Sequence, residues 1–150
     1  MIIAGEKING TILSVAKAIA QKDSDFIKDL AKTQADAGAD FIDVCASTDV
    51  SIELETMKWL IDLVQEAVDT PIAIDSPDAN ICAKSVAFCN KPGLINSVSM
   101  EGDKVDVVFP VIAISCHSCY RRGQQHLVQS ACPKICKSGF SCSGHGRRNG

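Results

Sequence analysis

The chain has 150 residues, 46% hydrophobic and 22% charged, with a formal net charge of −3 at pH 7. This composition is that of an ordinary globular domain, and no apolar run approaches the ~20 residues that span a bilayer. The first ten residues, MIIAGEKING, carry an acid where a signal peptide would carry basic residues, so we expect a cytoplasmic protein that is not a membrane protein.

Short β-branched runs alternate with amphipathic helices along the first three quarters of the chain. The pattern predicts strands over residues 2–7, 41–46, 71–75, 94–99 and 111–115, and helices over 12–21, 24–37, 52–68, 78–89 and 101–109. Such an order favours a parallel sheet covered on both faces, either an open doubly wound sheet or a (β/α)₈ barrel. Several local signals support the helix boundaries, namely Asp23 or Ser24, Gly38, Asp49 or Ser51, and Ser76 followed by Pro77.

Polar residues recur where each predicted strand gives way to the following loop. They are Glu6 and Asn9, Asp43 and Cys45, Asp75 and Ser76, and Asn96 and Ser97. In a barrel these positions would ring one mouth, where barrel enzymes keep their sites, and no GxGxxG motif follows the first strand to favour a nucleotide-binding open sheet. Such residues can also be caps or turn formers. Because Ser76 can already cap the next helix, we expect Asp75 to line a pocket, whereas Asp43 is expected to have a structural or indirect role.

Four segments in order carry a family resemblance. GEKING at 5–10, AGADFIDVCA at 37–46, IAIDS at 72–76 and LINSVS at 94–99 resemble the pterin-binding family, and most closely its methyltetrahydrofolate:corrinoid protein methyltransferases. The resemblance covers about residues 1–110. It implies a (β/α)₈ TIM barrel, of which this chain supplies the first four to five β/α units. One departure is Ser47, which stands where the family usually has glycine.

The resemblance also implies a site and a reaction. Asp75 and Asn96 would hydrogen-bond the pterin, since a carboxylate accepts from N–H groups and a carboxamide both donates and accepts. Glu6, Asn9 and Ser97 would line the pocket wall. The N5-methyl group of methyltetrahydrofolate would pass to Co(I) of a corrinoid (cobalamin) held by a partner protein, with electrostatic or general-acid help at N5 from a residue on later strands. A homodimer is implied, with no membrane or nucleic-acid partner.

The last 35 residues differ in kind from the rest. All 18 acidic residues lie within 1–110, whereas residues 111–150 hold six basic residues and no acid. The loss of acids and of helical periodicity favours a frameshifted or truncated gene product. We therefore expect an N-terminal half-barrel over 1–115 and an irregular, non-native Cys/Arg-rich tail over 116–150, and on this interpretation an inactive chain. The alternative for the tail is a zinc site formed by Cys116, Cys119, Cys132 and Cys136.

Two other functions stay open on the sequence. One is a dihydropteroate synthase-like enzyme, although the opening GEKING does not match the asparagine-threonine-proline turn typical of that group. The other is a pterin- or zinc-binding protein without catalysis.

Overall fold

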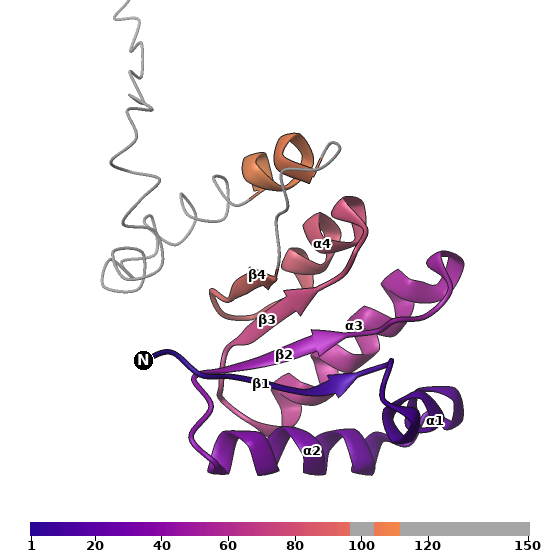
Figure 1. The fold of residues 1–150 in the computed structure, drawn as a ribbon, viewed down its shortest axis with the longest axis vertical. Helices are drawn as coiled ribbons and strands as arrows, with labels where there is room; N and C mark the ends of the chain where they lie inside the picture. Colours follow the sequence, from indigo (N-terminus) through magenta and orange to yellow (C-terminus); the bar gives the residue numbers. More distant parts are fainter. Residues whose placement is uncertain (97–103, 112–150) are drawn as a thin grey trace, which may run out of the picture. The chain divides into compact units, whose positions relative to one another are not determined.

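The computed structural model describes residues 1–96 and 104–111 (Figure 1). Its sheet has four parallel strands in the order β1-β2-β3-β4. They are β1 (Ala4–Asn9), β2 (Phe41–Cys45), β3 (Ile72–Asp75) and β4 (Leu94–Asn96). A doubly wound sheet reverses its strand order, whereas a barrel adds each new strand beside the last. The observed order is therefore that of a barrel segment, as the resemblance implied.

Helices connect the strands as the hydrophobic periodicity predicts. They are α1 (Leu13–Gln21) and α2 (Ser24–Asp36) after β1, α3 (Val50–Ala67) after β2, and α4 (Ala79–Ser85) with the 3₁₀ helix η1 (Val86–Phe88) after β3. A further helix spans 104–111. No helix within residues 1–96 and 104–111 is long and apolar enough to cross a membrane.

The hydrophobic core lies on one face of the sheet. Alternate strand residues such as Ile42, Val44, Ile72 and Ile74 are buried there against the helices, including the fully buried Leu60 of α3. The intervening strand residues point to the opposite face because side chains alternate along a strand. The helices of the described residues pack on this one face, as in a barrel wall, so of the two expected architectures the structure agrees with the barrel (Figure 1).

The helix ends confirm some predicted signals and correct one. Asp23 caps α2 by accepting from Phe26 N–H, and Gly38 after α2 has a left-handed φ of 89°. Asp49 is the N-cap of α3 but makes no side-chain cap bond. Ser76 is not the cap of α4. Asp78 takes that place, because the Ser76 hydroxyl is already engaged elsewhere.

Two predicted strands differ in extent from the observed ones. The first strand starts at Ala4 instead of residue 2, since Ile2 is 73% exposed and contributes nothing to the core. The predicted fifth strand cannot start at residue 111, which is helical, and residues 112–115 lie outside the described residues. Residues 97–99 of the fourth predicted strand also lie outside them.

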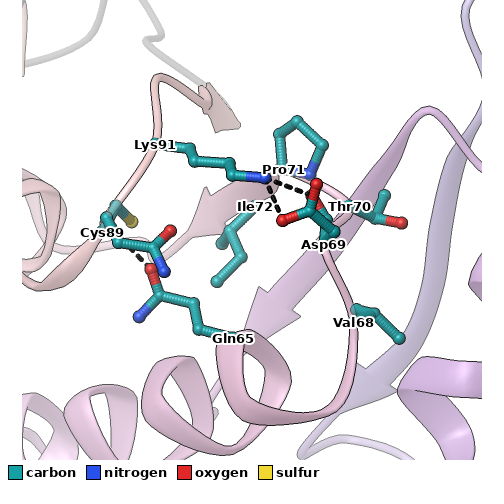
Figure 2. A pocket seen from close by; sticks show the side chains of 9 residues that line it. Gln65, Val68, Asp69, Thr70, Pro71, Ile72, Cys89 and Lys91 are labelled. Carbon is teal, nitrogen blue, oxygen red and sulfur yellow. Dashed lines mark hydrogen bonds and ion pairs between the residues drawn. The ribbon is translucent and has the colours of Figure 1, made fainter.

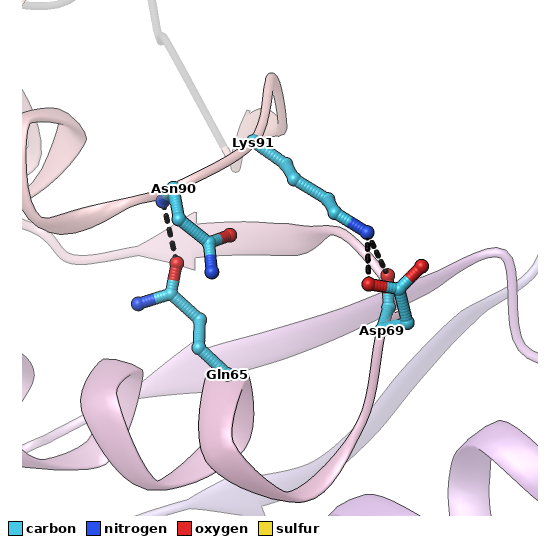
Figure 3. Close-up of polar contacts among 4 residues, drawn as sticks. All are labelled: Gln65, Asp69, Asn90 and Lys91. Atoms are coloured by element: carbon cyan, nitrogen blue, oxygen red, sulfur yellow. Dashed lines mark hydrogen bonds and ion pairs between the residues drawn. The ribbon is translucent and has the colours of Figure 1, made fainter.

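The amino ends of β3 and β4 are tied together by side chains around a small pocket (Figure 2). Gln65 at the end of α3 accepts from Asn90 N–H at 2.5 Å and donates to the Phe88 carbonyl at 3.0 Å. Lys91 forms an ion pair with Asp69 in the loop before β3 (Figure 3). These contacts fasten the segment that leads into β4 before the strand begins.

Candidate functional site at the carboxyl ends of the strands

The carboxyl ends of the four strands place polar side chains in one row. The parallel register pairs Asn9 with Cys45, Cys45 with Asp75, and Asp75 with Asn96. Register partners in neighbouring strands point to the same face of a sheet. Asp75 and Asn96 are therefore neighbours on the face away from the helices. The structure places side by side the two residues that the resemblance assigned to the pterin.

Asp43 belongs to the same site. Asn96 Nδ2 donates to Asp43 Oδ1 at 3.1 Å, although the two residues lie on β4 and β2 with β3 between them. The β3 residue opposite Asp43 is Ala73, whose small side chain leaves room for this reach. From its sequence alone, Asp43 was expected to have only a structural or indirect role. The signal that could have found it is its spacing of two from Cys45, which puts both side chains on one face.

Asp43 is 2% exposed, and burial is the largest cause that raises the pKa of its carboxyl group above the usual value. The hydrogen bond from Asn96 opposes this rise, whereas the negative charges of Asp75 and Glu6 add to it. Glu6 is exposed and acts on Asp43 from β1, at a bulge where the register shifts between Gly5 and Ile8. The site thus gathers three acids and one carboxamide.

Asn9 is the β1 member of the row, but its side chain bonds within its own turn. Its Oδ1 accepts from Thr11 N–H at 2.9 Å and from the Thr11 hydroxyl at 2.8 Å, closing the predicted turn. The next residue, Gly10, packs against the loop after β2, where an added Cβ would lie 1.9 Å from the Ala46 carbonyl oxygen. Only glycine allows the backbone to come this close, so Gly10 lets the loop after β1 pack against the loop after β2.

Cys45 and Ser47 form a second polar contact at this edge. The Cys45 sulfur lies 3.1 Å from the Ser47 hydroxyl oxygen, and Ser47 has a left-handed φ of 47°. That backbone conformation is one that glycine adopts without strain, which agrees with the glycine expected there. Burial, the largest cause, raises the pKa of Cys45 to about 11. The thiol is therefore protonated at neutral pH and is a poor nucleophile.

The other predicted ligands lie outside the described residues. These are Ser97 and the zinc candidates Cys116, Cys119, Cys132 and Cys136. Within residues 1–96 and 104–111, no three His, Cys, Asp or Glu side chains cluster closely enough to hold a metal ion.

Comparison with known proteins agrees with this geometry. Residues 5–120 match the family described as pterin binding enzyme. The chain is 59% identical over 111 residues to the methylcorrinoid:tetrahydrofolate methyltransferase of Eubacterium limosum. That match covers 74% of this chain and 41% of the relative, so the chain spans about two fifths of the relative's length. With more than half of its residues matched, and with parallel strands wound as in a barrel, the chain belongs to the pterin-binding enzyme family of TIM-barrel proteins.

Proposed function

We propose that this chain forms the pterin-binding half of a methyltransferase that moves a methyl group between tetrahydrofolate and a corrinoid on a partner protein. The observation that carries the proposal is the pairing of Asp75 with Asn96 at the carboxyl ends of β3 and β4. The relative's name supports the reaction class, because it names a methylcorrinoid and tetrahydrofolate. The relative's name describes transfer from a methylcorrinoid to tetrahydrofolate, which is the reverse of the transfer that we expected from the sequence. Both directions use the same two methyl carriers.

The donor and acceptor groups suit a pterin edge. The Asp75 carboxylate can accept from the adjacent N–H groups of the pyrimidinone ring. One N–H of Asn96 Nδ2 is donated to Asp43, so the other N–H and the Asn96 carbonyl oxygen are left for the ligand. Both groups stand on strands instead of mobile loops, which keeps the ring orientation fixed.

The chemistry at N5 needs groups beyond this half. The corrinoid supplies the cobalt centre that carries the methyl group. The role proposed for Asp75 and Asn96 is to hold and orient the pterin ring at the carboxyl ends of the strands. We propose that the group assisting N5 belongs to later strands of the barrel, as the resemblance implied. A corrinoid protein is then the proposed partner. Homodimerisation, a cytoplasmic location and the tail boundary near residue 115 stay predictions.

Binding of tetrahydrofolate to the chain is the first test. Isothermal titration calorimetry should show binding that Asp75→Asn weakens by about 10- to 100-fold, since hydrogen bonds to a charged group contribute roughly 1.5–3 kcal/mol. The matched control is Asp62→Asn, a partly exposed acid on α3 that is paired with Lys58 away from the strand ends, which should leave the affinity unchanged. Equal affinities for wild type and Asp75→Asn would refute the assigned role of Asp75.

A chimera tests the reaction itself. In it, this chain supplies the matching 111 residues of the Eubacterium limosum relative. Mixing the chimera with a methylated corrinoid protein and tetrahydrofolate should change the visible spectrum of the corrinoid as the methyl group leaves cobalt. The Asp75→Asn chimera should be much slower. Consumption of para-aminobenzoate without any corrinoid change would point instead to dihydropteroate synthase chemistry.

A further inference from the structure

We propose that Glu53 is a positioning residue for the pterin site, acting on Asp75 through Ser76. This inference rests on the proposed function, because it concerns the residue that would hold the pterin. Glu53 lies in the first turn of α3, and Ser76 directly follows Asp75 at the end of β3. Neither the family resemblance nor the strand-end pattern singles out Glu53.

The contact between these two residues is short and buried. The Ser76 hydroxyl donates to Glu53 Oε1 at 2.6 Å, a distance typical of a hydroxyl bound to an ionised carboxylate. Glu53 is 2% exposed and Ser76 is 1% exposed. A hydrogen bond shielded from water in this way holds its geometry better than an exposed one.

Burying this carboxylate costs free energy that a purely structural contact does not require. A buried charge is tolerated only when it is paired or well hydrogen-bonded, and a neutral side chain would fill the same space more cheaply. The first turn of a helix favours a negative side chain, because its backbone N–H groups carry partial positive charge. The position therefore suits a hydrogen-bond acceptor under the loop that follows Asp75.

The backbone of Ser76 is held from other directions as well. Its carbonyl oxygen accepts from the Cys82 thiol of α4 at 3.3 Å and from Lys104 Nζ at 3.3 Å. The Ser76 hydroxyl oxygen also accepts from Asp78 N–H at 3.1 Å, next to the cap of α4. Ser76 is thus tied to α3, to α4 and to the helix 104–111.

These ties constrain the residue beside them. Because Asp75 and Ser76 share a peptide bond, fixing the Ser76 side chain and carbonyl fixes the backbone direction from which the Asp75 carboxylate projects. Asp75 is the last residue of its strand, so the ladders to Cys45 of β2 and Asn96 of β4 flank it but do not hold the chain that follows it. The contact with Glu53 supplies the constraint beyond the strand end. An error of about 1 Å in a binding group can lower activity by as much as 100-fold, which makes such a constraint consequential.

Three variants of the full chain test the proposal. Glu53→Gln keeps an acceptor oxygen but loses the charge, Ser76→Ala removes the donor, and the third variant combines both. Tetrahydrofolate affinity is measured by calorimetry, and the melting temperature is measured on each sample. Each single variant should weaken tetrahydrofolate binding by several-fold. The double variant should bind about as tightly as the weaker-binding single variant, because both substitutions break the same contact.

The matched control is Ile61→Val, which removes one methylene from a fully buried position of the same helix. It should lower the melting temperature without changing the affinity. If Glu53→Gln and Ser76→Ala lose affinity no more than Ile61→Val does, the contact is only structural and the proposal is wrong.

A second measurement separates this outcome from failure of the proposed function. In ¹H–¹⁵N spectra without ligand, Glu53→Gln should shift the amide resonances of Asp75 and Asn96, which are distant from it in the chain, whereas Ile61→Val should not. If wild type binds no tetrahydrofolate, the proposed function fails for this chain and the assigned purpose of Glu53 fails with it. Binding by wild type together with unmoved Asp75 and Asn96 resonances in Glu53→Gln would overturn the positioning role alone.

Discussion

At the scale of single residues, the buried carboxyl group of Asp43 lowers the stability of the fold. The pKa of Asp43 is raised in the folded protein, mainly because its carboxyl group is buried. Between the ordinary pKa of 3.8 and the raised one, the folded state binds more protons than the unfolded state. Folding stability therefore falls as the pH rises through this window, and the penalty is fully present above the raised pKa. Asp43 is thus better explained by the ligand site than by the stability of the fold.

Replacing Asp43 by Asn should increase stability at pH 7. A carboxamide cannot ionise, so the penalty disappears, and the oxygen of the new side chain could still accept from Asn96 Nδ2. The increase in the free energy of unfolding should shrink as the pH falls toward 3.8, where wild-type Asp43 becomes protonated in both states. Urea titrations at pH 7 and pH 4 measure both values. Exposed Asp29→Asn is the control, and an Asp43→Asn variant that is less stable than wild type at pH 7 would contradict this account.

At the scale of secondary structure, β4 depends on contacts outside its own ladder. The strand has three residues, too few for its hydrogen bonds alone to fix the register. A slip of one residue would turn Asn96 to the helix face and remove it from the site. Gln65 and Lys91 fasten the chain before the strand (Figure 3). Gly93 lets the chain before β4 pack closely against β3, because an added Cβ would lie 2.0 Å from the Ile72 carbonyl oxygen.

The variant Gly93→Ala should therefore affect both stability and binding. The added methyl group would clash with backbone atoms of Ile72, which cannot move aside as a flexible side chain can. We therefore expect a loss of roughly 1–3 kcal/mol in the free energy of unfolding. Displacing β4 should also weaken tetrahydrofolate binding through Asn96. The matched control is Gly38→Ala, where φ is 89° but no atom lies within 4 Å of an added Cβ. It should cost about 1–2 kcal/mol without any loss of affinity. Similar affinities for the two variants would show that Gly93 does not position Asn96 for binding.

At the scale of the whole described domain, the sheet has two unpaired strand edges. Among the described residues, β1 pairs with β2 alone and β4 pairs with β3 alone. A full barrel removes such edges by closure, whereas an open edge invites pairing with another chain. Next to β1, Met1 and Ile2 are 108% and 73% exposed. These features support the prediction that the chain associates with itself.

Light scattering coupled to size-exclusion chromatography should detect that association. The apparent mass of the chain should rise with concentration, and Ile2→Lys should reduce the rise, because a charge beside an edge strand disfavours pairing. The chimera described above should elute with a mass independent of concentration over the same range. A monomeric chain at every concentration would show that these edges are covered in solution.

The sequence alone was enough for features set by near neighbours. Apolar spacing in Leu60, Ile61 and Val64 marks the helix α3, and the apolar run that stops at Asp75 marks where β3 ends. Asp75 and Asn96 could be expected to lie together because the carboxyl ends of parallel strands must meet at one edge.

What needed the tertiary structure were contacts between residues distant in the chain. Sequence cannot say that Ser76 turns to Glu53 instead of capping α4, because their separation of 23 residues is closed only when α3 packs on the sheet. Nor can it say that Asn96 reaches Asp43 across Ala73, since that depends on the register of three strands together. Local propensity decides which segments are helix or strand, while packing and register decide which side chains meet.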